Sequence, residues 1–211
     1  MNKKVSVSGI NAFITRIWIF DLSEQLLAHQ QQWLDITTEM RQQTVNSQGR
    51  SNRHGWNSEK TVFHNPAFDS LNMVARECFK YAFKDQEFYE YETLSFGLEA
   101  WVNAHDPGGY NMMHMHPRVI MSGCFYLDVP EKSGKIVFSD PRPGAHHAPV
   151  YSHSELGSGN LTLTPKSGQL VIFPNYLEHC VETNESDSQR VSIPMNATIV
   201  QTKTIKGALH G

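Results

Sequence analysis

The apolar positions of the first 90 residues recur at helical spacing. Between residues 22 and 40 they follow steps of three or four residues, or multiples of these, and form one stripe. Its members are Leu22, Leu26, Trp33, Ile36 and Met40. A second helix is predicted to begin at Asn65-Pro66, because asparagine caps helices and proline suits their first turn. It presents a second apolar stripe, made of Phe68, Leu71, Val74, Cys78 and Tyr81. Both stripes are typical of helices that pack on a core, with a polar connector, residues 46–58, between them.

From about Thr93 the pattern changes to short alternating segments with Gly/Pro punctuation. Residues 94–102 alternate as a strand, and further strands are predicted at 121–129, 135–139, 161–163, 169–173 and 190–199. Loops are predicted at 106–109 and 141–144. Short strands at this spacing favour a sandwich or a barrel of the jelly-roll kind, between which periodicity does not choose.

The chain has 211 residues, of which 39% are hydrophobic and 18% charged, so it can bury a core. With no internal repeat, we interpret residues 1–211 as a single domain of the α+β, mainly β, class. Its helical flanking part is 1–90 and its β core is 91–203.

Charge and cysteine content narrow the functional classes. Lys+Arg is 18 and Asp+Glu is 21, a net charge of −3 without a basic stripe, so a nucleic-acid partner is not expected. Three cysteines without a CxxC motif indicate free thiols in a reducing cytoplasm. No segment has the ~20 apolar residues of a membrane helix, and no signal peptide is expected. The prediction is a cytoplasmic protein, whose helical half could form a homodimer face.

Among eleven histidines, those near residue 115 carry the chemical argument. If residues 111–117 are extended, His114 and His116 point to the same face, and His179, after a distant apolar strand, is a candidate third ligand. Three imidazoles with open positions suit Fe(II), Zn(II), Cu(II) or Ni(II). The alternative is a pair of hydrogen-bonded or surface histidines.

One strand near the C-terminus carries a polar face. Arg190, Ser192 and Asn196 alternate with apolar neighbours, which is unusual for a core strand. A pocket for a ligand carboxylate would use the fork of Arg190 and the hydroxyl of Ser192. The alternative is a polar edge that faces solvent.

Together these stretches resemble the Fe(II)/2-oxoglutarate-dependent oxygenases, and in particular a group of bacterial and phage 2-oxoglutarate/Fe(II) oxygenases. The resemblance covers roughly residues 95–200, and residues 55–58 show a weaker similarity to the same group. Its motifs are 101–103, Gly109, Asn111, 114–117, 122–123, 126–127, 138–142, 168–174, His179 and 190–192.

The resemblance implies a double-stranded β-helix (a cupin-like jelly roll) with flanking N-terminal helices, and Fe(II) at one mouth. His114 and His179 match the two histidine ligands, while His116 stands where the superfamily usually has a carboxylate. If His116 ligates, the Fe(II) site keeps a net charge of +2 instead of +1, which changes its redox potential. Alternatively His116 does not ligate, and Asp140 or a water completes the coordination.

The cosubstrate implied is 2-oxoglutarate, with its distal carboxylate on Arg190 and Ser192 and with Tyr126 and Asn103 as helpers. The two helpers could equally be a core tyrosine and a turn asparagine. We therefore expect a dioxygenase of the hydroxylase type, acting on an unidentified small-molecule or peptidyl substrate. The alternatives are a three-histidine cupin or zinc hydrolase that does not use 2-oxoglutarate, and a non-catalytic metal- or ligand-binding jelly roll.

The remaining histidines are assigned lesser roles. His105 is expected to be a turn residue, and His146, His147 and His153 lie in a loop that is either simply exposed or a lid. The methionines that flank His114 are candidate pocket lining, and Cys180 is expected to pack.

Overall fold

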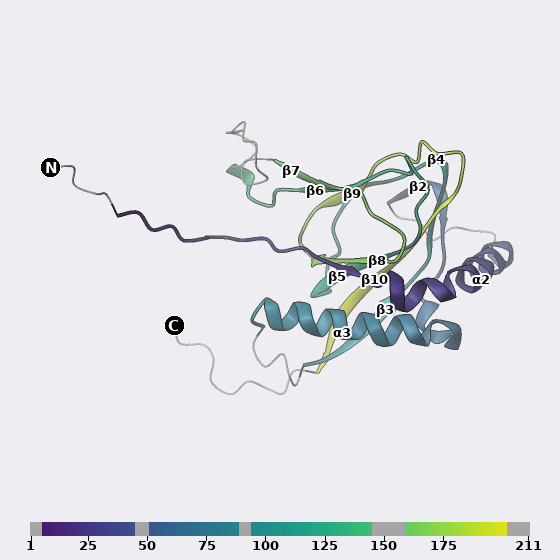
Figure 1. Cartoon of the computed structure of the whole chain (residues 1–211), viewed down its shortest axis with the longest axis horizontal. Coiled ribbons are helices and arrows are strands. Elements are labelled where there is room, and N and C mark those ends of the chain that lie inside the picture. The colour runs from purple at the N-terminus through teal and green to yellow at the C-terminus, as the bar shows by residue number, and fades with distance from the viewer. Residues whose placement is uncertain (1–5, 45–50, 89–93, 145–158, 202–211) are drawn as a thin grey trace.

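The computed structural model describes residues 6–44, 51–88, 94–144 and 159–201, and its main feature is one curled sheet of ten strands (Figure 1). The strands are β1 (Trp18–Asp21), β2 (Asn52–Asn57), β3 (Ser95–Ala100), β4 (Asn103–His114), β5 (Met121–Asp128), β6 (Ile136–Ser139), β7 (Asn160–Leu163), β8 (Gln169–Pro174), β9 (His179–Val181) and β10 (Arg190–Gln201). The helices are α1 (Ser23–Leu26), α2 (Gln30–Gln43) and α3 (Asp69–Asp85), with 3₁₀ turns η1 (Leu27–His29), η2 (Val62–His64) and η3 (Pro66–Phe68).

The strand order shows that the sheet closes on itself. Neighbouring strands follow the order β1-β8-β5-β10-β4-β9-β6-β7, while β2 pairs with β4 and β3 with β10. Three strands separate β8 from β9 in this order, yet Phe173 on β8 packs on His179 on β9 with ring centroids 4.7 Å apart. The sheet therefore encloses an interior.

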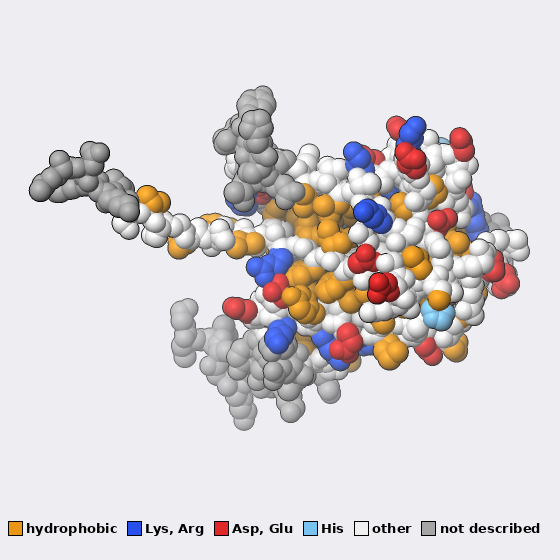
Figure 2. All heavy atoms as spheres, in the orientation of Figure 1, with side chains coloured by type: hydrophobic (Ala, Val, Ile, Leu, Met, Phe, Trp, Pro, Cys, Tyr) orange, Lys and Arg blue, Asp and Glu red, His pale blue; other side chains and the backbone are white. Residues whose placement is uncertain are grey.

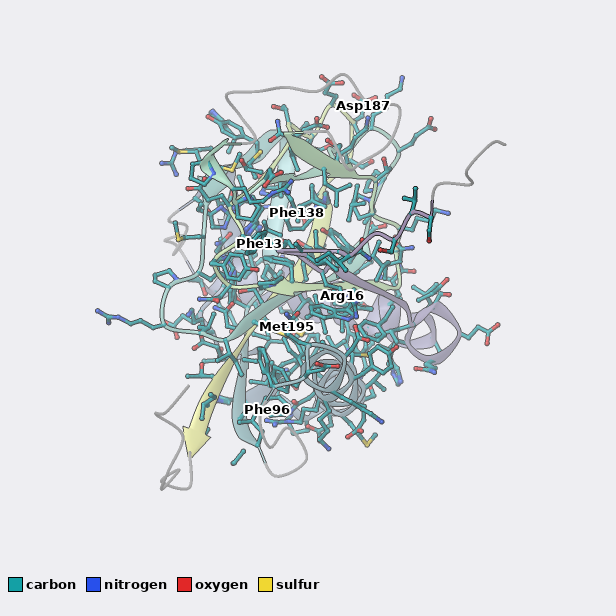
Figure 3. All side chains as sticks on the ribbon, turned by 90° about the vertical axis from the view of Figure 1, so that its left-hand side faces the viewer. Phe13, Arg16, Phe96, Phe138, Asp187 and Met195 are labelled. Carbon is teal, nitrogen blue, oxygen red and sulfur yellow. The ribbon has the colours of Figure 1, made fainter. Side chains whose placement is uncertain are left out.

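Two hydrophobic clusters divide the core. The larger one joins the helices to the outside of the sheet, and α3 runs along the sheet beside β3 in Figure 1. The smaller one fills the interior and consists of Tyr126, Ile136, Phe138, Val171, Phe173 and Leu177. In Figure 3, Phe138 of the inner cluster lies above Met195 and Phe96 of the larger one.

The helices confirm the apolar stripes. Leu22, Leu26 and Trp33 are buried, although η1 interrupts the first helix between α1 and α2. The Asn65 side chain accepts a hydrogen bond from the amide N–H of Ala67 at the start of η3, and α3 follows directly. The second helix buries Phe68, Leu71 and Cys78 of its predicted face, whereas Tyr81 of that face is 55% exposed.

The strands depart from the predicted pattern at four places. β1 and β2 lie in the part expected to be helical or connecting, and β9 was not predicted. Residues 106–109, expected to be a loop, belong to β4, where the pairing with β2 shifts register. They form a bulge within the strand rather than a turn between strands.

No helix among the described residues is long and apolar enough to span a membrane. The three cysteines are free thiols. On the face seen in Figure 2, acidic and basic side chains are interspersed around apolar areas.

Candidate metal centre

Two strands bring three histidines together. His114 ends β4 and His179 begins β9, and the two residues are direct partners in the antiparallel pairing. Beyond the end of β4, the amide N–H of His116 donates to the carbonyl of Asn175 (3.2 Å). The ring centroids of His114, His116 and His179 lie 4.3 to 5.2 Å apart, and one nitrogen of each ring lies within 4.8 Å of the others.

Hydrogen bonds orient two of the rings. The Nδ1 of His114 lies 2.7 Å from the carbonyl oxygen of Met112, and that of His179 lies 2.9 Å from the carbonyl oxygen of Leu177. A carbonyl only accepts, so each Nδ1 carries the hydrogen and each Nε2 keeps its lone pair for a metal.

Burial keeps the three imidazoles neutral. It lowers the pKa of His114, that of His116 to about 4 and that of His179 to about 3. The ring of Phe173 packs on His179, which is 4% exposed. Neutral imidazoles are the form that binds metal ions, and this donor set therefore fits a first-row divalent cation.

The buried, positively charged side chain of Arg190 lines the same cavity as the three histidines, and the volume of this cavity is about 830 Å³. Arg190 is 1% exposed, and its Nε and Nη1 have no hydrogen-bond partner among the described residues. Its guanidinium lies 5.3 Å from the ring centroid of Tyr126, whose buried hydroxyl also lacks a partner in the described part of the chain. Burial raises the pKa of Tyr126 well above its usual value, so the hydroxyl stays a neutral donor.

These unpaired donors fit a ligand carboxylate. Leaving a buried guanidinium without an anion costs free energy, and a carboxylate can accept both of its forked N–H groups. Ser192 also lines the cavity, and its hydroxyl donates to the carbonyl oxygen of Asn103 (3.4 Å). The donors therefore fit the distal carboxylate of 2-oxoglutarate.

Asn103 is placed differently from the expectation. It is absent from the cavity lining, and its amide joins a buried network in which Asn52 donates to its Oδ1 (2.7 Å) and its Nδ2 donates to Asn111 (2.9 Å). The network joins β2 to β4, the strand that ends in His114. Asn103 thus lies behind the site, where it supports β4.

Other predicted residues fall into three groups. Asp140 lies outside the histidine cluster, and its two oxygens accept hydrogen bonds from Arg142. His105 is fully buried beside Arg190 in the β4–β10 pairing, so its assignment to a turn is wrong. His146, His147 and His153 lie outside the described residues.

The mouth of the cavity holds the methionines. Met112, Met113 and Met115 line it and are 44 to 48% exposed. The lining also includes residues that the sequence reasoning did not assign to the site, Cys124 and Glu99 among them. Cys124 follows from the same alternation as Tyr126, whereas the position of Glu99 depends on the pairing of β3 with β10.

The comparisons with known proteins agree with this geometry. Residues 99–196 match the sequence model of a family described as "Putative 2OG-Fe(II) oxygenase". No curated protein matches the chain.

Three solved structures illustrate the similarity of fold. A prolyl-4-hydroxylase from Pseudomonas putida is 14% identical, with 89% of this chain and 94% of that one covered and a TM-score of 0.61. The viral collagen prolyl hydroxylase of Paramecium bursaria Chlorella virus-1, in complex with 2OG, is 11% identical over 88% and 96%, with a TM-score of 0.57. HygX from Streptomyces hygroscopicus, with nickel and 2-oxoglutarate bound, is 9% identical over 88% and 84%, with a TM-score of 0.61. These likenesses confirm the double-stranded β-helix.

Proposed function

Because residues 99–196 match the sequence model of a 2OG-Fe(II) oxygenase family, we propose that this protein is a dioxygenase of that family and hydroxylates a C–H bond of its substrate. Fe(II) and 2-oxoglutarate are the cofactors of that family. The observation that carries the proposal is the shared cavity, in which three imidazoles accompany Arg190, whose Nε and Nη1 have no hydrogen-bond partner in the described part of the chain.

Each residue of the cavity has a role in this proposal. His114, His116 and His179 would hold the iron, and Arg190 would bind the distal carboxylate, assisted by Tyr126. When bound, iron and 2-oxoglutarate supply the oxidising chemistry that activates O2. The protein's part is to fix the geometry of the bound groups and to exclude water from them.

The inner cluster supplies that exclusion. Phe173 and Phe138 pack on His179 with ring centroids 4.7 and 5.9 Å from its own. The ring of Tyr126, another member of this cluster, lies against the guanidinium of Arg190. Water is thereby kept from the inner side of the site, where charge interactions are strongest.

The substrate would enter from the side of the methionines. Met112, Met113 and Met115 flank His114 at the mouth, and methionine adapts its shape to apolar groups. We therefore place an apolar part of a small-molecule or peptidyl substrate against them. The similar structures include prolyl hydroxylases and HygX, so they do not select one substrate.

Arg190→Gln tests the proposal, with Arg118→Gln as the control because Arg118 lines the exposed mouth of the same cavity. Anaerobic protein with Fe(II) and 2-oxoglutarate should show the visible charge-transfer band, and in air it should slowly form succinate. Loss of a charge-assisted pair predicts binding of 2-oxoglutarate weaker by on the order of 100-fold in Arg190→Gln. Arg118→Gln should behave as wild type; a wild-type protein with neither band nor succinate would overturn the proposal.

The rival three-histidine enzyme makes a different prediction. A zinc hydrolase uses the imidazoles and leaves the buried Arg190 without a role. Zinc retained after growth in iron-rich medium, with metal-dependent activity unchanged in Arg190→Gln, would favour it.

A further inference from the structure

His116 differs from the other two histidines in what holds its Nδ1. Backbone carbonyls hold those of His114 and His179, whereas the Nδ1 of His116 lies 2.8 Å from Asn196 Oδ1 and 2.7 Å from Ser122 Oγ. A hydroxyl can donate or accept, and an amide can present either its oxygen or its NH2 group. These two side chains alone would therefore allow either nitrogen of His116 to carry the hydrogen.

Glu99 removes the ambiguity in the amide. Glu99 on β3 and Asn196 on β10 are partners across the strand pair, and Asn196 Nδ2 lies 3.4 Å from Glu99 Oε1. The same Oε1 accepts from the Lys60 ammonium group. A carboxylate only accepts, so the NH2 group of Asn196 faces Glu99 and its Oδ1 faces His116.

The orientation of the Asn196 amide then determines which atoms around His116 Nδ1 donate a hydrogen and which accept one. Ser122 Oγ donates its hydrogen to Asn196 Oδ1 (2.9 Å), which leaves only lone pairs on the hydroxyl towards His116. Both oxygens near the Nδ1 of His116 are then acceptors, so this nitrogen carries the hydrogen. The lone pair lies on Nε2, the nitrogen that remains for a metal.

We propose that Glu99, Asn196 and Ser122 are positioning residues that fix the tautomer of His116 and so make it the third metal ligand. The site then keeps a carboxylate, that of Glu99, which reaches His116 through one intervening amide instead of binding the metal. This inference rests on the metal site of the proposed function and not on its cosubstrate.

Two measurements without turnover test it. Long-range ¹H–¹⁵N correlation spectra of the metal-free protein report which nitrogen of each histidine carries the hydrogen, and optical titration with Co(II) reports metal affinity. Wild type should show His116 with hydrogen on Nδ1. Glu99→Gln supplies an amide that can donate to Asn196 Oδ1, so Asn196 can turn over, and Co(II) affinity should fall about tenfold.

A second substitution should rescue the first. In Glu99→Gln/Asn196→Asp, the carboxylate introduced at position 196 has only acceptor oxygens, so it accepts the hydrogen of His116 Nδ1 in either orientation. The amide introduced at position 99 can donate to the same carboxylate. We expect the Nδ1–H tautomer and the Co(II) affinity to return. A merely structural role of Glu99 would not be restored in this way.

Two controls separate orientation from charge. Glu59→Gln removes another carboxylate from the same cavity without touching Asn196, and Lys60→Met removes the ion pair while keeping Glu99. Both should retain the wild-type tautomer and affinity. Hydrogen on Nε2 of His116 in wild type, or equal affinities in Glu99→Gln and Glu59→Gln, would overturn the inference. Intact Co(II) binding with no 2-oxoglutarate band would instead contradict the proposed function alone.

Discussion

Arg190 is, after Trp33, the largest side chain that is fully buried among the described residues, and it carries a charge. Its nearest titratable neighbours do not neutralise it. Burial and the guanidinium together lower the pKa of His105 to about 4, and Tyr126 keeps its hydrogen. A buried cation without an anion costs several kcal/mol. Arg190 has no ion-pair partner among the residues that the structure describes, so the fold bears this cost at the point where a ligand carboxylate would remove it.

Tyr126→Phe separates the stability of the chain from ligand binding. The hydroxyl is buried without a partner among the described residues, so its removal should leave the free energy of unfolding unchanged or slightly higher. The affinity of the metal-loaded protein for 2-oxoglutarate should fall about threefold to tenfold, because the variant loses one neutral hydrogen bond to the ligand. Urea denaturation and ligand titration measure the two effects. A marked loss of stability would show that the hydroxyl bonds elsewhere in the protein.

From the sequence, the side chains that share a face of one strand could be predicted better than the contacts between side chains on different strands. His114 and His116 share a face because side chains alternate, and Arg190, Ser192 and Asn196 do so for the same reason. Asn103 also lies on a predicted face, but its amide is taken by Asn52 and Asn111. Which side chains meet across β2, β4 and β10 depends on register, which the pattern of one strand does not contain.

At the scale of elements, β2 crosses very close to β4. A Cβ added at Gly55 would lie 2.5 Å from the backbone oxygen of Ala104 and from Asn52 Oδ1. Gly55→Ala should therefore lower the free energy of unfolding by about 1–3 kcal/mol, since the backbone cannot yield as a side chain can. Gly9→Ala, where a Cβ meets nothing within 4 Å, should change it little. Equal stabilities in denaturant titrations would contradict this close approach.

The contact between α2 and the bulge of β4 should make stability depend on pH. Arg41 on α2 donates two hydrogen bonds to Asp106, at 2.8 and 2.7 Å, and lowers the pKa of that carboxyl. The pKa of Asp106 is therefore lower in the folded state than in the unfolded state, where it is about 3.9. The ionised carboxylate stabilises the fold at pH values above about 3.9, and this stabilisation is lost as the pH falls through the folded-state pKa.

Asp106→Asn should therefore destabilise the protein at pH 7, by less than about 1 kcal/mol because the pair is partly exposed. The difference from wild type should close as the pH falls below about 3.9. Denaturant titrations at several pH values measure it. Asp187→Asn, at an exposed carboxylate without an ion pair among the described residues, is the control. A difference that persists at low pH would mean that Asp106 acts through something other than its charge.

At the scale of the whole molecule, the class of fold could be predicted and the closure of the sheet could not. Helical stripes followed by short alternating strands indicate helices on a jelly roll. The short strand β9 has three residues, too few to show a period, yet it carries His179 into the interior. β1 and β2 come from the helical half and join the sheet through pairings with β8 and β4. Long-range pairing of this kind has no local signal.

The two hydrophobic clusters imply that stability and metal binding are separable. Phe79 on α3 packs on Phe83 and Phe96 in the larger cluster, whereas Phe173 packs on His179 inside the sheet. Phe79→Leu and Phe173→Leu remove similar volume from buried sites, so each should lower the free energy of unfolding by about 1–2 kcal/mol. Only Phe173→Leu should also weaken Co(II) binding, by a few-fold, because it frees the ring of His179 to leave its orientation.

The comparison needs conditions in which both variants are folded, which circular dichroism before each Co(II) titration establishes. Effects at distant sites add independently, so Phe79→Leu should bind Co(II) as wild type does, despite its lost stability. Equal weakening in both variants would show that the helical layer and the metal centre form one cooperative unit. The orientation of His179 would then depend on the whole core rather than on its contacts with Phe173 and Phe138.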